Sequence, residues 1–315
     1  MPSPHAFAVL LGTSHLSLIP GLSGAGKTPE DTWKTPARDA AFVAGNSPYP
    51  SCLTVAAVTK AMCTLTGTTP HFFNAGHAGH LPVPAQVLSH NPAGDPREGP
   101  SVTDAEIIVQ NSAEIGGALA ENYQTLWLGE CIPGGTTHAL CIIRALGIRG
   151  RVSSSDLKKT GPAKEAVWEA VLNRSPCVCN LRGTALLRET GDPVMAAAFG
   201  LILGFPGNIV LCGGTQMLAV AALAGDTKGR VSCAMTDLVW QDAEADVPFI
   251  AETAGIPVTV SPVPSRFVQS PSPSRACIRE VKEGFGAGGA LAMARRCGFS
   301  ESEIEAALAT VIQQE

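Results

Sequence analysis

A predicted strand that runs into a glycine-rich turn holds the first residues that could do chemistry. Residues 126–140 read LWLGECIPGGTTHAL, so an apolar strand ends in Gly-Glu, and a helix with two early threonines follows a Gly-Gly turn. Free N–H groups, the positive end of a helix dipole and two hydroxyls can together bind a phosphate. An ordinary strand–turn–helix, with Thr136 as the N-cap, explains this segment equally well when it is taken alone.

The second segment of interest is a glutamate followed by small residues. Residues 283–290 read EGFGAGGA and lead into a predicted helix. Small residues let the backbone approach a ligand closely, and they place Glu283 at the entrance of that helix. An acidic residue at such a position is most often only a favourable partner for the helix dipole. Taken alone, the segment therefore favours a structural role for Glu283.

Residues 21–28, GLSGAGKT, match the phosphate-binding P-loop pattern. That pattern requires a strand before the loop and a helix after it. Pro20 stands where a buried strand should end, Pro29 follows the loop, and residues 30–36 have no apolar face to pack on a sheet. We therefore predict that no helix follows, and that the segment is a glycine-rich loop lining a different ligand site. A P-loop kinase or ATPase is the less favoured alternative.

Composition argues against binding to nucleic acid or membranes. The 315-residue chain has a formal net charge of −5, which offers no basic surface for nucleic acid. The longest apolar passage, residues 194–214, contains the turn sequence GFPGN. In lipid this turn would leave backbone polar groups unpaired, so we interpret the passage as helix, turn and strand.

The ten cysteines and the clustered histidines do not predict a metal site. Cysteines within apolar runs (Cys63, Cys141, Cys212 and Cys233) read as small buried hydrophobes. Cys177 and Cys179 are one residue apart with no second pair at zinc spacing, which favours structural thiols. His71, His77 and His80 are interpreted as surface or loop-anchoring residues. The first residues do not resemble a signal peptide, so we expect reduced thiols and a cytoplasmic protein.

The order of predicted elements indicates an α/β fold. Strands are expected at 6–11, 71–74, 124–129, 208–212, 231–235 and 257–260. Helices are expected at 51–65, 105–121, 135–146, 164–173, 193–203, 215–224, 243–254, 285–297 and 301–313, the last with a capping box at Ser300 and Glu303. Residues 12–50 and 76–104 read as loops, apart from a short helix at 38–43. This alternation predicts three layers, with a mostly parallel sheet and helices on both faces.

Five segments resemble the family of nicotinate mononucleotide:dimethylbenzimidazole phosphoribosyltransferases, and they occur along the chain in the same order as in that family. GNSPYPSCLT at 45–54 is similar to the family's GVSAYPxxVT, and NAG at 74–76 to its Asp-Ala-Gly. GECIPGGTT at 129–137 resembles GEMGIGNTT, and KEGFGAGGALA at 282–292 resembles GEGxGAALA. Residues 191–223 are similar to the family's passage of GG, helix, strand, LDGF and helix. IPGLSGAGKTPE at 19–30 further resembles a divergent archaeal and cyanobacterial branch.

The resemblance implies transfer of phosphoribose from nicotinate mononucleotide to an aromatic base during cobalamin assembly, without a metal or cofactor. Glu283 matches the family's general base, a role that suits a carboxylate desolvated beside an apolar pocket. The implied phosphate- and ribose-binding residues are Glu130, Gly134, Gly135, Thr136, Thr137, Lys164, Gly213 and Gly214. The implied base-binding residues are Ser47, Tyr49, Pro50, Gly284 and Gly286. For Lys164, a solvated lysine at a helix end remains an equal alternative. The family also implies a homodimer.

Three departures from the family pattern leave the acceptor base open. Cys212 stands where the family has Asp, Ala56 where it has a Gln that contacts the base, and Lys282 where it has Gly. A non-catalytic nucleotide-binding or regulatory protein is therefore a second hypothesis. We predict one unit over residues 1–315, in which a large α/β part at about 68–275 is joined by a small helical part formed from about 12–67 and 276–315.

Overall fold

The computed structural model describes residues 4–48, 50–154, 160–269 and 277–312, and it is built around one sheet. Seven parallel strands lie in the order β3-β2-β1-β4-β5-β6-β7. They are β1 (His5–Leu11), β2 (His71–Ala75), β3 (Gln86–Ser89), β4 (Thr125–Cys131), β5 (Asn208–Cys212), β6 (Val231–Thr236) and β7 (Val258–Ser261). After β1 the chain adds β2 and β3 on one side of it and then β4 to β7 on the other side. The strand order therefore reverses between β1 and β4. Ligands of open α/β sheets bind beside such a reversal, at the carboxyl ends of the strands.

The central strands are buried on both faces, as their continuous apolar sequences require. In β1 the side chains of Phe7, Val9 and Leu11 belong to one core, and those of the alternate residues belong to the other. The same alternation continues in β4, where Trp127 faces the first of these cores and its two neighbours face the second. The predicted three-layer α/β architecture is confirmed, and the sheet is parallel throughout.

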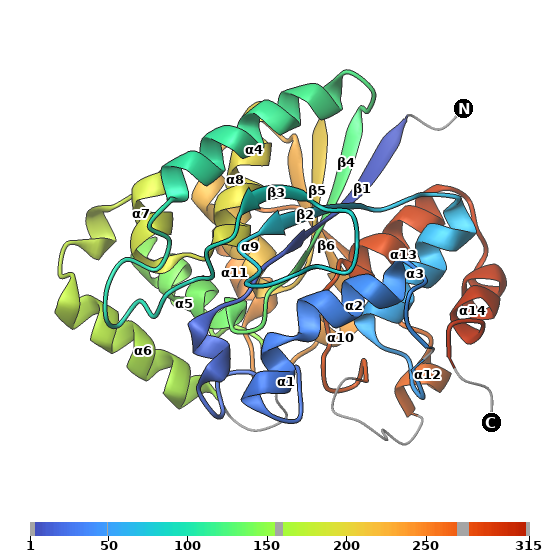
Figure 1. Ribbon diagram of the computed structural model, residues 1–315, viewed down its shortest axis with the longest axis horizontal. Helices are drawn as coiled ribbons and strands as arrows, with labels where there is room; N and C mark the ends of the chain where they lie inside the picture. Colours follow the sequence, from blue (N-terminus) through green and yellow to red (C-terminus); the bar gives the residue numbers. More distant parts are fainter. Residues whose placement is uncertain (1–3, 49, 155–159, 270–276, 313–315) are drawn as a thin grey trace.

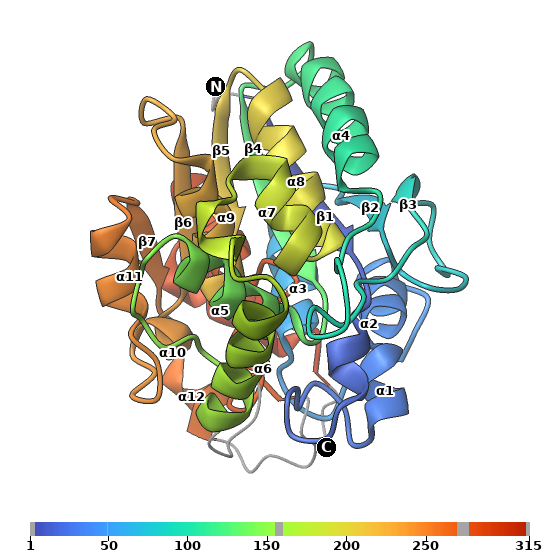
Figure 2. The ribbon, with the colours of Figure 1, turned by 90° about the vertical axis from the view of Figure 1, so that its left-hand side faces the viewer.

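One face of the sheet is covered by the helices on the left in Figure 1, which Figure 2 shows from in front. They are α4 (Ala105–Ala120), α5 (Gly135–Ala145), α6 (Gly161–Arg174), α7 (Gly183–Thr190), α8 (Pro193–Gly204), α9 (Thr215–Ala224) and α11 (Val247–Thr253). Helices α4 and α8 pack together closely because Gly116 and Gly204 have no side chain at the point where the two backbones meet. Asp192 begins α8 by accepting a hydrogen bond from the Met195 N–H.

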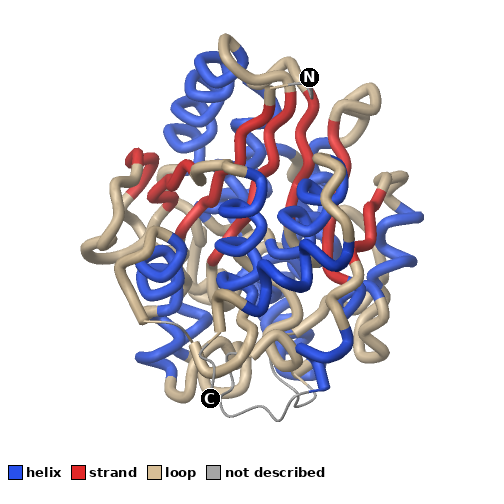
Figure 3. The backbone as a smooth tube through the Cα atoms, turned by 90° about the vertical axis from the view of Figure 1, so that its right-hand side faces the viewer, coloured by secondary structure: helices blue, strands red, loops and turns tan. Residues whose placement is uncertain are grey.

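The opposite face is covered by helices from the two ends of the chain, on the right in Figure 1 and in front in Figure 3. They are α2 (Thr35–Val43), α3 (Val55–Thr66), α13 (Ala287–Arg296) and α14 (Glu301–Ala309). Helix α3 packs against both α13 and α14, and all four helices share a core with the sheet. The capping box of α14 is confirmed at Ser300 and Glu303. The division of the chain at about 68 and 275 remains a prediction.

Short elements complete the fold, and several of them differ from the sequence-based expectation. They are the 3-10 helices η1 (His15–Leu18) and η2 (Val178–Asn180) and the short helices α1 (Pro29–Trp33), α10 (Asp237–Trp240) and α12 (Ser265–Gln269). Strand β3 and helix α7 were not predicted either. The prediction that no helix follows the glycine-rich loop is wrong, because the Thr28 side chain caps α1 and Pro29 occupies its first turn. No helix in the described part of the chain is both long and apolar enough to cross a bilayer.

Candidate active site

Strands β4, β5 and β6 end side by side, and the segments that follow them enclose a small cavity. The strands pair in register, so their carboxyl ends lie on one edge of the sheet. The cavity has a volume of about 60 Å³, and its lining residues are Glu130, Thr136, Ser153, Ser154, Gly214, Thr215, Gln216, Val239, Lys282 and Glu283. The fold thus brings the predicted phosphate segment and the predicted general base to the same cavity, although Glu130 and Glu283 are 153 positions apart in the sequence.

Glu283 is held by the backbone of its own loop and of the end of β6. Its carboxylate accepts hydrogen bonds from the N–H groups of Thr236 (2.8 Å), Gly284 (3.1 Å) and Gly288 (3.2 Å). Burial raises the pKa of Glu283 to about 7, although these N–H groups favour the charged form. A carboxyl group with this pKa can accept a proton near neutral pH, as a general base must.

The loop after Glu283 has an unusual backbone that docks on the end of β4. Gly284, Phe285 and Gly286 all have positive φ, which is strained for a side chain as large as that of Phe285. The Phe285 N–H donates to the Glu130 carbonyl at 2.6 Å, and the Thr59 hydroxyl donates to the Phe285 carbonyl at 2.9 Å. A Cβ on Gly286 would lie 3.0 Å from the Cα of Gly129. These contacts fix Glu283 relative to the strand that carries Glu130.

Glu130 lies at the end of β4 and lines the cavity. Burial, followed by the nearby carboxylates of Asp192 and Glu283, raises the pKa of Glu130 to about 8. Burial also raises the pKa of Asp192 to about 7, and the Asp192 carboxylate accepts a hydrogen bond from the Gln216 amide at 3.0 Å. Glu130 is therefore mainly protonated at neutral pH, so it can donate a hydrogen bond and does not repel a nearby anion.

Two helix N-termini reach the cavity without a side-chain cap. Gly134 precedes α5 with φ of 88°, and Gly214 precedes α9; neither helix has a capping hydrogen bond from a side chain. The alternative in which Thr136 caps α5 is therefore wrong. Thr215, in the first turn of α9, is 1% exposed, and its hydroxyl has no partner among the described residues. In α5 the Gly135 and Thr137 N–H groups donate to the Ile132 and Gly134 carbonyls, so the Thr136 N–H is the one left for a ligand among its first three. This N–H group, the first N–H groups of α9 and the unpaired Thr215 hydroxyl form an environment suited to an anion.

The predicted phosphate- and ribose-binding residues Gly135, Thr137 and Gly213 lie close to the smaller cavity but do not line it. Gly135 contacts the Gln216 side chain, and Gly213 lies against Met217 and the Glu130 side chain. Thr137 is fully buried, with its hydroxyl unpaired among the described residues. These residues are close to the cavity, and their roles in binding remain predictions.

Lys164 reaches the site through Thr136. Its side chain is buried, and its Nζ donates hydrogen bonds to the Thr136 hydroxyl and the Ser153 carbonyl, both at 2.9 Å. The alternative of a solvated lysine is therefore wrong. Burial lowers the pKa of Lys164 to about 7. Because the Thr136 oxygen accepts from Lys164, the hydroxyl hydrogen of Thr136 is free to donate into the cavity.

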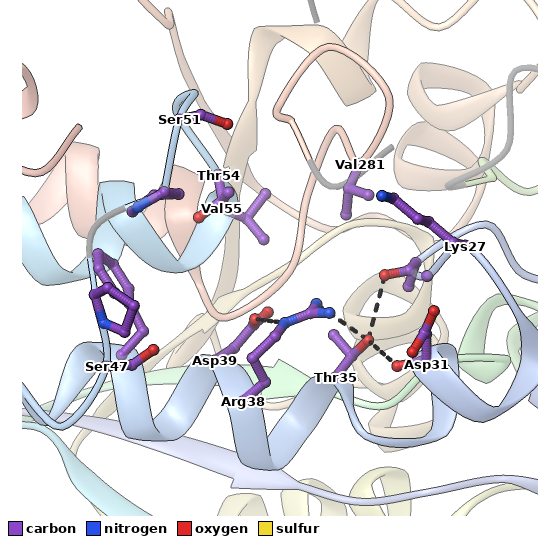
Figure 4. A pocket seen from close by; sticks show the side chains of 15 residues that line it. Lys27, Asp31, Thr35, Arg38, Asp39, Ser47, Ser51, Thr54, Val55 and Val281 are labelled. Atoms are coloured by element: carbon purple, nitrogen blue, oxygen red, sulfur yellow. Dashed lines mark hydrogen bonds and ion pairs between the residues drawn. The ribbon is translucent and has the colours of Figure 1, made fainter. Parts of the chain in front are cut away.

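Figure 4 shows a second and larger cavity, of about 480 Å³. Two of the predicted base-binding residues, Ser47 and Pro50, line it, and so does Val281, which precedes Lys282 and Glu283 in the chain. Tyr49 lies outside the described residues. Gly284 and Gly286 do not line this cavity; Gly286 packs instead against Phe7 and the backbone of β4.

The larger cavity is also lined by charged residues, which the sequence did not predict. Lys27, Asp31, Thr35, Arg38 and Asp39 line it. Arg38 donates hydrogen bonds to Asp39 at 3.2 Å and to Thr35 at 3.3 Å. The glycine-rich loop contributes Lys27 to this cavity, and the 3-10 helix η1 precedes the loop where a P-loop would have a strand.

The cysteines and histidines are placed largely as expected, with one exception. Cys63, Cys141, Cys212 and Cys233 are buried, and His77 is buried in the loop after β2. Cys177 and Cys179 are free thiols on and beside η2. The expectation that all thiols are reduced is wrong for Cys52 and Cys277, which form a disulfide. No group of His, Cys, Asp and Glu within the described residues is arranged to hold a metal ion.

Comparison with known proteins identifies similar sequences and a similar fold. The chain is 35% identical to a UPF0284 protein of Pyrococcus furiosus over 319 aligned positions, covering 95% of both chains. It is 33% identical to a UPF0284 protein of Saccharolobus solfataricus over 315 positions, covering 95% of this chain and 90% of the relative. No protein-family model matches the chain.

Two solved structures from Thermus thermophilus have a similar fold. One is described as a nicotinate-nucleotide-dimethylbenzimidazole phosphoribosyltransferase; it has a TM-score of 0.63 and 17% identity, covering 98% of this chain and 84% of its own. The other, described as CobT, has a TM-score of 0.64 and 16% identity, covering 99% of this chain and 87% of its own. At this level of identity the likeness confirms the predicted fold.

Proposed function

This chain belongs to the UPF0284 protein family, and on that premise we propose that it is a phosphoribosyltransferase. The proposed reaction moves phosphoribose from nicotinate mononucleotide to a nitrogen of an aromatic base and releases nicotinate. One observation supports it above the others: a single cavity is lined by Glu283 and by residues at two uncapped helix N-termini. A likeness in fold to nicotinate-nucleotide-dimethylbenzimidazole phosphoribosyltransferase agrees with it.

In this proposal the smaller cavity holds the phosphate, with the ribose at its opening. The phosphate accepts hydrogen bonds from the Thr136 N–H in α5, from the first N–H groups of α9, and from the hydroxyls of Thr136 and Thr215. Lys164 orients Thr136 through the hydrogen bond between them. Protonated Glu130 donates to the ribose, and its neutral state avoids repulsion with the phosphate.

The larger cavity holds the acceptor base, with Ser47 and Pro50 on one side and Val281 on the other. Glu283 takes the proton from the ring nitrogen that attacks the anomeric carbon. A new carbon–nitrogen bond forms on one face of the ribose while the bond to nicotinate breaks on the other, so the configuration inverts. The bonding electron pair returns to the pyridinium nitrogen, and this neutralisation favours departure. Holding both reactants in line supplies much of the acceleration.

A non-catalytic nucleotide-binding protein remains the second candidate, because of Cys212. This residue stands where the resembled family has an aspartate, yet it is fully buried and its thiol donates to the Val210 carbonyl. A ribose contact from that position is therefore absent in this chain. A homodimer is also part of the proposal, and the mass of the protein in solution tests it.

The proposed function is tested by incubating the protein with nicotinate mononucleotide and a panel of benzimidazoles and purines. Release of nicotinate together with formation of a base–ribose 5-phosphate product is the expected result. Binding of the mononucleotide without nicotinate release for any base would favour the non-catalytic alternative. A crystal soaked with nicotinate mononucleotide should place the phosphate at the start of α5 and α9.

The dependence of kcat/KM on pH should have the shape of a bell. Activity is expected to rise with pH up to about 7, because Glu283 must lose its proton before it can act as a base. Activity should fall above about 8, where Glu130 ionises and repels the phosphate. The carboxylates of Glu130 and Glu283 interact, so the two apparent pKa values of the profile belong to the pair of residues rather than to either one alone. Glu130→Gln should remove the alkaline limb; a limb that persists would point to Lys164 instead.

A further inference from the structure

Lys282 is the one residue of the smaller cavity that the family resemblance marked as a departure, and it lies beside the proposed phosphate site. It precedes Glu283, and both side chains line the cavity with Thr136 and Thr215. The cavity volume of about 60 Å³ gives room for roughly four waters. A single phosphate group would fill that space, so it would come into contact with the lysine.

The partner of Lys282 in the free protein is a buried carboxylate. Its Nζ lies 2.7 Å from a carboxylate oxygen of Asp242, and the two side chains are 19% and 5% exposed. The same oxygen of Asp242 accepts a hydrogen bond from the Ser153 hydroxyl at 2.8 Å. Burial opposes ionisation of Asp242, but the hydrogen bonds from Lys282 and Ser153 outweigh it and lower the pKa of this carboxyl group.

Asp242 keeps other partners if Lys282 leaves it. Ser153 still donates to one carboxylate oxygen, and the Glu244 N–H donates to the other at 3.2 Å. The Ser153 carbonyl in turn accepts from Lys164. The carboxylate would therefore stay hydrogen-bonded, which lowers the cost of releasing the lysine to another anion.

We propose that Lys282 exchanges Asp242 for the 5′-phosphate of the substrate, and that this exchange makes the site selective for phosphorylated over unphosphorylated nucleosides. The inference rests on the proposed function for the identity of the substrate. In the free protein Lys282 is paired with Asp242, so the Asp242 carboxylate and the substrate phosphate compete for the same ammonium group. Lys282 then acts as a specificity-determining residue, and Asp242 as its competitor.

The test compares binding of nicotinate mononucleotide with binding of its dephosphorylated nucleoside, nicotinate riboside, by isothermal titration. Lys282→Met is expected to weaken binding of the mononucleotide by roughly 10- to 100-fold, the range that one charge-assisted hydrogen bond supplies. Binding of the riboside should change by less than about threefold. The matched control is Lys228→Met, an exposed lysine near the amino end of β6, which should alter neither constant.

Asp242→Asn is the second variant in this binding experiment, and its expected effect would not arise if Lys282 and Asp242 had only a structural role. Removing the competing carboxylate should tighten binding of the mononucleotide by roughly 3- to 10-fold, because more of the protein then has a free Lys282. In the Lys282→Met background the same substitution should have little effect, since the two residues act as a coupled pair. If Lys282→Met does not fold, Lys282→Gln is used in the same comparison.

Each outcome decides for or against the exchange. An equal loss of affinity for the mononucleotide and the riboside, or no loss for either, would overturn it. So would a gain from Asp242→Asn that persists without Lys282. Selectivity that depends on Lys282 without any nicotinate release would support the exchange and contradict the transferase function. Nicotinate release by the wild type, with unchanged selectivity in Lys282→Met, would support the transferase function and contradict the exchange. Wild-type protein that binds neither ligand would contradict both the exchange and the transferase function.

Discussion

Glu283→Gln should lower turnover of nicotinate mononucleotide by about 10²- to 10⁴-fold, the range typical of general-base catalysis. The amide keeps the size of the carboxyl group but cannot take a proton from the acceptor base. Three backbone N–H groups now donate to the carboxylate, and an amide oxygen can still accept from part of this set. The fold should therefore survive with a modest loss of stability, about 1–3 kcal/mol for a donor left unpaired.

The measurement is single-turnover kinetics on protein whose circular dichroism matches the wild type. Glu106→Gln is the matched control, because Glu106 is an exposed residue in the first turn of α4, and activity should not change. The pH dependence adds a second criterion: the acid limb near pH 7 should disappear with Glu283. A loss of less than tenfold, or an acid limb that stays, would mean that another group accepts the proton.

Gly288→Ala should destabilise the protein by about 1–3 kcal/mol, the usual cost of overpacking a tight contact. A Cβ at this position would overlap the backbone of Met235 and Thr236, where α13 crosses the end of β6. Backbone atoms of a central strand cannot move aside as a side chain can, so helix and strand must separate. The Gly288 and Thr236 N–H groups both hold the Glu283 carboxylate, so the substitution should reduce turnover as well.

Gly117→Ala is the matched control for this prediction. Gly117 also lies inside a helix, but the nearest atom to an added Cβ is the Gly204 carbonyl oxygen at 4.0 Å. Replacing a helical glycine with alanine where space allows stabilises a protein by roughly 0.5–1 kcal/mol. Urea denaturation should therefore shift the two midpoints in opposite directions. Equal midpoints for both variants would show that α13 can move away from β6 at little cost.

The fold could be predicted from sequence where local pattern and tertiary role agree. The passage from α8 through β5 to α9 was predicted to within a residue, because an apolar helix, a turn sequence and an apolar strand follow each other directly. Strand β3 was missed because Gln86 and Val87 are exposed at the sheet edge, so the strand has no apolar pattern. Helix α1 was missed because Thr28 and Pro29, which read as breakers, in fact begin it.

The candidate site could be predicted in part, for a similar reason. Thr136 and Glu283 lie in glycine-rich segments whose sequences mark them, and both line the smaller cavity. Asp192 could have been recognised from its position before Pro193 as a helix start. Asp242 could not, because only the tertiary fold brings it to Lys282. The charged lining of the larger cavity was missed for the same reason: apart from Lys27 in the glycine-rich loop, its charged residues lie on two short helices that carry no motif.

The disulfide between Cys52 and Cys277 joins residues 225 positions apart and closes the chain between them into a covalent ring. All of the sheet except β1 lies inside this ring, as do Glu130 and Lys164, whereas Glu283 follows it directly. A protease that cuts once within the ring would therefore leave a single molecule of unchanged mass, apart from one added water. Its two pieces would separate on a denaturing gel only after a reductant had opened the bond.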